Sequence, residues 1–167
     1  MQNTKIVKFF YKLNFFLIVT FFFLTIVIIN FLLIKIFPEN ALSIPDKLIN
    51  ISHSWFGKVF MVIIGPAFET LFFQMIPILA TRELVSKDNN VFIISTLVSS
   101  LTFALAHGIY GRYYMLYAFV GGVLLAILYN VSIYRKDPPF LPVFIIHALW
   151  NLVVLLLIET NFFNNII

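Results

Sequence analysis

The chain has 167 residues, of which 62% are hydrophobic and only 11% charged, and its mean hydropathy is +1.02. In soluble domains roughly a quarter of the residues are charged, so this composition excludes an ordinary soluble fold. It equally excludes disorder. At ~20 helical residues per bilayer crossing and roughly 10 more per connection, the length predicts about five transmembrane helices. We therefore expect an all-α, polytopic membrane helix bundle. The absence of cysteine rules out disulfides and thiolate metal sites.

The predicted spans follow the long apolar runs in chain order. Residues 13–34 form an uncharged run of about 22 residues, longer than the ~7–15 residues of a signal-peptide core, so we expect an uncleaved first span. In residues 38–58, prolines and charged residues interrupt the apolar pattern, and this segment is predicted to lie along the membrane interface, where Trp residues such as Trp55 are enriched. The remaining spans are predicted at residues 59–80, 91–109, 115–133 and 140–158. This divides the chain into an N-terminal part, 1–58, and a core, 59–167.

The basic residues account for the net charge of +4 and predict the orientation. They lie near span ends, where anionic lipid explains them, so we do not expect nucleic acid as a partner. With the N-terminus inside, seven of them face inward and four outward, which favours that orientation. The inward set is Lys5, Lys8, Lys12, Arg82, Lys87, Arg135 and Lys136, and the outward set is Lys35, Lys47, Lys58 and Arg112. The composition, rich in Phe, Ile, Asn and Lys, further hints at a bacterial plasma membrane.

Four polar residues within the predicted spans are the candidate site. Glu69 is the only acid deep in a span, where a carboxylate costs ~2.5–3.5 kcal/mol on insertion scales, and such residues are usually functional. His107 and His147 are the only histidines in spans, and Asn151 shares a helix face with His147 because it follows four residues later. Each alone could be a packing residue or interhelical bond. Together they are expected to converge, since polar side chains avoid lipid.

Gly65 and Pro66 lie just before Glu69 and are expected to disturb the helix there. Proline removes one backbone hydrogen bond and clashes with the carbonyl of Val62, which predicts a kink. The kink could open a gap beside the carboxylate for water. The alternative is an ordinary packing kink, which is common in membrane helices.

Three segments resemble motifs of the CPBP family of intramembrane proteases (CAAX proteases and bacteriocin-processing enzymes), over about residues 59–156. They are the run from Gly65 to Gln74, the run from Phe103 to Gly108 and the run from His147 to Asn151. The resemblance implies that Glu69 is a catalytic base and that His107, His147 and Asn151 are catalytic. The family's second Glu is Thr70 here and its Arg is Gln74. We expect Thr70, Gln74 and Phe103 to support the catalytic residues rather than to react.

Two mechanisms fit these residues. Glu69, His107 and His147 could bind Zn²⁺ and leave one position for water, but this scheme needs a separate base, and no other acid lies in a span. In the metal-free scheme, which we favour, Glu69 activates a water oriented by His107, and His147 and Asn151 stabilise the oxyanion. No cofactor is then required.

The expected function is intramembrane hydrolysis of a peptide bond in a membrane-associated protein or peptide. The alternatives are a non-catalytic scaffold or bacteriocin-immunity protein of the same family and, less favoured, a small transporter. One feature opposes a shared site. Counted from the predicted outer span ends at 1.5 Å per residue, Glu69 lies roughly 15 Å deep, His107 about 3 Å and His147 about 17 Å.

Overall fold

The computed structural model describes residues 9–10, 12–36, 46–85 and 90–160, and the regular structure in these ranges is entirely helical. This confirms the predicted all-α class. Within the same ranges, five helical stretches are long and apolar enough to cross a membrane, as predicted. They are Phe15–Leu33, Trp55–Leu84, Val91–Tyr110, Arg112–Arg135 and Phe140–Glu159. Their orientation across the membrane stays a prediction.

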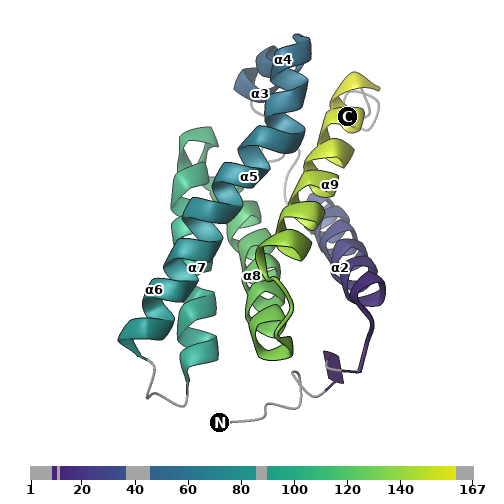
Figure 1. Ribbon diagram of the computed structural model, residues 1–167. Coiled ribbons are helices and arrows are strands. Elements are labelled where there is room, and N and C mark those ends of the chain that lie inside the picture. The colour runs from purple at the N-terminus through teal and green to yellow at the C-terminus, as the bar shows by residue number, and fades with distance from the viewer. Residues whose placement is uncertain (1–8, 11, 37–45, 86–89, 161–167) are drawn as a thin grey trace.

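The first span, helix α2 (Phe15–Ile36), lies at the side of the bundle against α8 (Arg112–Arg135) and α9 (Phe140–Glu159) (Figure 1). Ile18, Phe22 and Ile26 are buried against the bundle, and their spacing of four residues places them on one helix face. The opposite face exposes large apolar side chains, which suits contact with lipid.

The second span is longer than predicted. It runs without interruption through α4 (Trp55–Val59), η2 (Phe60–Ile64), α5 (Gly65–Glu69), η3 (Thr70–Met75) and α6 (Ile76–Leu84). It therefore extends four residues beyond each end of the predicted range 59–80.

The segment 38–58 is only partly as expected. Residues 55–58 form the first turn of the same helical stretch as the second span, and the interfacial position of the segment stays a prediction. Residues Asp46–Ser52 form the short helix α3, which packs on α4 and α9, and residues 37–45 lie outside the described part of the chain.

Two π-helical turns interrupt the second span, each directly before a proline. The amide of Gly65 donates to the carbonyl of Phe60, and the amide of Ile76 donates to that of Leu71, five residues back in both cases. Pro66 and Pro77 follow at once. A proline ring clashes with the carbonyl four residues before it, and the wider turn moves that carbonyl aside. The predicted disturbance at Pro66 thus takes the form of a π turn.

Neighbouring helices supply the hydrogen-bond donors that these turns need. The Asn151 side-chain amide donates to the Met61 carbonyl at 2.9 Å. The hydroxyls of Ser99 and Thr102 donate to the Phe73 carbonyl at 3.1 and 3.2 Å. A carbonyl left open in an apolar core is costly, so these bonds tie the second span to its neighbours.

Helix α8 is the centre of the bundle. Half of its apolar window is buried, against a third or less in the other spans. It packs most extensively on α7 (Val91–Ala106), where Gly122 lies so close that an added Cβ would be 3.3 Å from the Cα of Ser100. Gly122 and the fully buried Ala126 thus form a small-residue face that lets the helices pack closely. Gly121 faces open space within the described residues.

A buried polar cluster joins α6, α7 and α8 near the ends of α6 and α8. Asn130 is fully buried and accepts hydrogen bonds from Arg82 at 2.9 Å and from Ser95 at 3.2 Å. The Arg82 guanidinium also lies 5.1 Å from the centre of the Tyr134 ring. This cluster fixes the register of the three helices below the site.

Candidate functional site

Glu69 and His107 lie at nearly equal distances from the ends of α6 and α7 that follow one another in the chain. Glu69 lies 15 residues before the end of α6 at Leu84 (84 − 69), and His107 lies 16 residues after the start of α7 at Val91 (107 − 91). At 1.5 Å per residue the two are about 22 and 24 Å from these helix ends. The expectation of different depths is therefore wrong, because the second span extends further outward than α7.

His147 reaches the same level from a different starting point. It is the eighth residue of α9, about 10 Å from Phe140 along the helix axis. Figure 1 shows that α9 begins above the lower ends of α6 and α8, which compensates for the shorter distance. The three side chains therefore come from three helices that begin at different levels.

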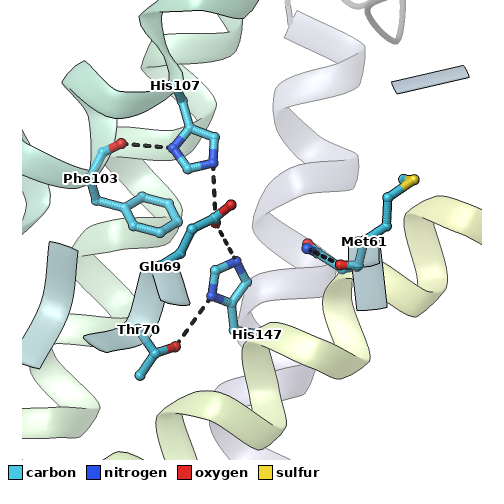
Figure 2. A network of polar contacts seen from close by, with 7 residues as sticks. Met61, Glu69, Thr70, Phe103, His107 and His147 are labelled. Carbon is cyan, nitrogen blue, oxygen red and sulfur yellow. Dashed lines mark hydrogen bonds and ion pairs between the residues drawn. The ribbon is translucent and has the colours of Figure 1, made fainter. Parts of the chain in front are cut away.

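The carboxylate of Glu69 lies between the two imidazole rings (Figure 2). Its Oε2 is 3.2 Å from Nε2 of His147 and 3.5 Å from Nε2 of His107. Both distances fall within the ~6 Å expected for groups that one water can bridge, so these three residues converge as predicted. Oε2 is buried and makes no aligned hydrogen bond within the described part of the chain, whereas Oε1 lies beside Gly65.

The tautomer of His107 follows from its backbone partner. Its Nδ1 lies 2.7 Å from the carbonyl of Phe103, which only accepts, so Nδ1 must carry a proton. In the neutral ring Nε2 is then a hydrogen-bond acceptor that faces the carboxylate. The Phe103 ring packs on His107 with centroids 4.4 Å apart and meets His147 edge-on at 5.4 Å. Phe103 therefore holds both rings in place.

Thr70 contacts His147 rather than the carboxylate. Its hydroxyl lies 3.5 Å from Nδ1 of His147, and both residues are buried. A hydroxyl that donates to Nδ1 leaves Nε2 of a neutral imidazole protonated, and Nε2 then faces Glu69 as a donor. The Nε2 atoms of the two imidazoles would thus play opposite roles beside the carboxylate, that of His107 as an acceptor and that of His147 as a donor.

Gln74 lies further from the carboxylate, on the side toward α7. Its Oε1 accepts a hydrogen bond from the Ser99 hydroxyl at 2.7 Å, and its side chain is fully buried. Its Nε2 has no hydrogen-bond partner among the described residues.

Asn151 lines a pocket beside Glu69, but its side-chain amide donates to the carbonyl of Met61. The geometry thus gives it a contact with the helix that carries Glu69 rather than with the carboxylate.

A pocket lies beside Glu69, bounded by α9, by α3 and the second span, and by the turn between α7 and α8. The residues that line it are Ile51, Phe60, Met61, Gly65, Glu69, His107, Tyr110, Tyr114, Asn151 and Val154. Gly65 matters here because it has no side chain, and Glu69 Oε1 lies 3.8 Å from where its Cβ would be. The expected gap next to Gly65 is therefore present.

Two tyrosines of this pocket were missed in the sequence. The Tyr114 ring stacks on His107 at 5.9 Å and meets the Tyr110 ring edge-on at 5.2 Å. Residues 110–114 were predicted to form a connection. Instead His107–Tyr110 form a 3-10 turn, η4, and α8 already begins at Arg112, three residues before the expected start. Because the chain turns at Gly111, where φ is 113°, Tyr114 reaches His107 from a different helix, and helical spacing in the sequence does not indicate the stack.

Within the described ranges, no group of three or more His, Cys, Asp or Glu residues is arranged to hold a metal ion. The choice between the zinc and the metal-free schemes stays a prediction.

Helices long and apolar enough to span a membrane thus bring one carboxylate and two imidazoles together beside a pocket, an arrangement that marks a functional-site candidate. Residues 51–153, more than half of the chain, match the family model described as type II CAAX prenyl endopeptidase Rce1-like, and the chain belongs to this family. The predicted CPBP resemblance is thereby confirmed. No curated protein and no solved structure gives a significant match.

Proposed function

We propose that the chain is an intramembrane endopeptidase that hydrolyses a peptide bond of a membrane-associated protein or peptide with a water activated by Glu69. The observation that carries this proposal is the placement of Glu69 Oε2 within 3.5 Å of two imidazole nitrogens at the edge of a pocket. Family membership supports the same class of reaction.

Glu69 and His107 act together on the water. Glu69 and His107 both line the pocket, and the carboxylate and the unprotonated Nε2 of His107 are both acceptors, so a water in the pocket beside them donates one proton to each. Its lone pair then points away from both, toward a substrate carbonyl in the pocket. Glu69 takes the proton as the water oxygen bonds to the carbonyl carbon.

The other polar groups act on the tetrahedral intermediate. The Nε2–H of His147 donates to the oxyanion, and the Asn151 amide has a second N–H, free of Met61, that serves the same purpose. Glu69 returns its proton to the amide nitrogen as the C–N bond breaks, and the carboxylate is restored.

A non-catalytic scaffold or immunity protein is the alternative. It is favoured by Thr70 and Gln74, which are neutral and fully buried where the family pattern has Glu and Arg. The metal-free scheme does not require either residue to react, so it accommodates both substitutions.

Proteolysis in reconstituted vesicles tests the proposal. Purified protein is mixed with a library of membrane-anchored peptides, and the products are identified by mass spectrometry. Glu69→Gln should lower cleavage at least about 100-fold, because the amide cannot accept the proton. The matched control is Glu83→Gln, an exposed carboxylate outside the pocket, which should cleave like wild type. Cleavage by Glu69→Gln at the level of Glu83→Gln would refute Glu69 as the base, and absence of cleavage by the wild type would favour the scaffold.

A further inference from the structure

The π turn before Glu69 leaves one backbone carbonyl without a backbone donor. In this turn amides bond five residues back, as Gly65 does to Phe60, so the amide of residue 66 would serve the carbonyl of Met61. Residue 66 is proline and has no N–H. Asn151 of α9 fills the place at 2.9 Å. One side-chain amide thus completes the turn from a different helix.

Asn151 is part of a longer line of contacts along α9. His147, Asn151, Leu155 and Glu159 recur every four residues and so follow one helix face. His147 meets Glu69 after the π turn, Asn151 meets Met61 within it, and Glu159 pairs with Lys58 before it. Leu155 between them is buried. Helix α9 therefore contacts the second span on both sides of the turn.

The π turn determines how the two halves of the second span are rotated. It adds one residue to a helical turn, so its loss would rotate α4 against α5 by about 100°. Without the Asn151 donor, the carbonyl of Met61 is open in the π turn, and only an α-helical turn kinked by Pro66 would let Gly65 satisfy it. That change cannot keep both Lys58 and Glu69 facing α9.

We propose that Asn151 is a positioning residue, whose amide replaces the N–H that Pro66 lacks and thereby holds Glu69 against the imidazoles. The consequence for catalysis rests on the proposed function, whereas the structural role does not. The positioning role is compatible with the proposed oxyanion contact, because the bond to Met61 uses only one of the two N–H groups of Asn151.

The first test is kinetic. Asn151→Leu keeps a side chain of similar size without a donor, and a carboxylate displaced by about 1 Å can cost roughly 100-fold in rate. We expect kcat to fall by about that factor while KM changes little. The control, Leu152→Ala, alters an exposed neighbour on α9 and should leave both constants unchanged.

The second test reports the turn itself. The chain has no cysteine, so Lys58→Cys with Glu159→Cys introduces a single pair across the contact between α4 and α9. A short thiol-reactive cross-linker should join this pair in the otherwise wild-type and Leu152→Ala backgrounds. We expect the link to be lost in the Asn151→Leu background.

The two tests have distinct failures. Cross-linking that persists in Asn151→Leu would overturn the positioning role, whatever the effect on kcat, and leave Asn151 as an oxyanion donor alone. If the wild type shows no proteolysis, the proposed function fails, yet loss of the link would still support the role of Asn151 in the π turn.

Discussion

The unpaired amide of Gln74 makes a sharp prediction about stability. Gln74 is fully buried, and its Nε2 has no hydrogen-bond partner among the described residues. A buried donor without a partner costs about 1–3 kcal/mol. Gln74→Leu removes this donor and also the bond from Ser99, which is worth ~0.6 kcal/mol between membrane helices. Ser99 still donates to the Phe73 carbonyl, so no new group is left unpaired. We therefore expect Gln74→Leu to stabilise the protein by about 0.5–2 kcal/mol.

Ser99→Ala is the matched comparison. It leaves both polar ends of Gln74 without a partner, while the Phe73 carbonyl keeps the Thr102 hydroxyl. The free energy of unfolding should fall by about 1–2 kcal/mol in Ser99→Ala and by less when Gln74→Leu is already present.

Equilibrium unfolding in mixed micelles measures the wild type, the two single variants and the double variant. A Gln74→Leu protein that is less stable than wild type by ~1 kcal/mol or more would refute the reasoning, since it would mean that Nε2 has a partner worth keeping.

Three further predictions concern the surroundings of the site. Thr70→Glu alone should destabilise the protein, because a second buried carboxylate would share His147 with Glu69, whereas adding Gln74→Arg should restore stability by pairing the charge; greater stability and faster cleavage in the single variant would contradict this. Gly122→Val should cost about 1–3 kcal/mol and slow cleavage, because its Cβ would lie 3.3 Å from the Phe103 ring that packs on both histidines; unchanged thermal unfolding would speak against it. Chelators should leave cleavage intact and purified protein should contain no stoichiometric zinc, whereas one bound Zn²⁺ that is lost in His107→Ala would establish the metal scheme.

Apolar run length was enough to predict the spans and their number. Burial of a charge or imidazole in a bilayer is costly wherever the helix lies, so Glu69, His107 and His147 stood out before their positions were known. The three sequence segments shared with the family likewise depend on residue identity and spacing alone. The all-α class and the candidate site residues could therefore be predicted from the sequence, because both depend on residue type and spacing.

Depth and register were decided by tertiary structure. The count from span ends failed for His107 because the second span extends further outward than α7, so the two helix ends do not lie at one level. The partner of Asn151 was equally hidden, since a π turn depends on which register leaves the fewest carbonyls open once Pro66 is packed against α9. Sequence determines which groups must be satisfied, and only the assembled helices determine which neighbour satisfies each of them.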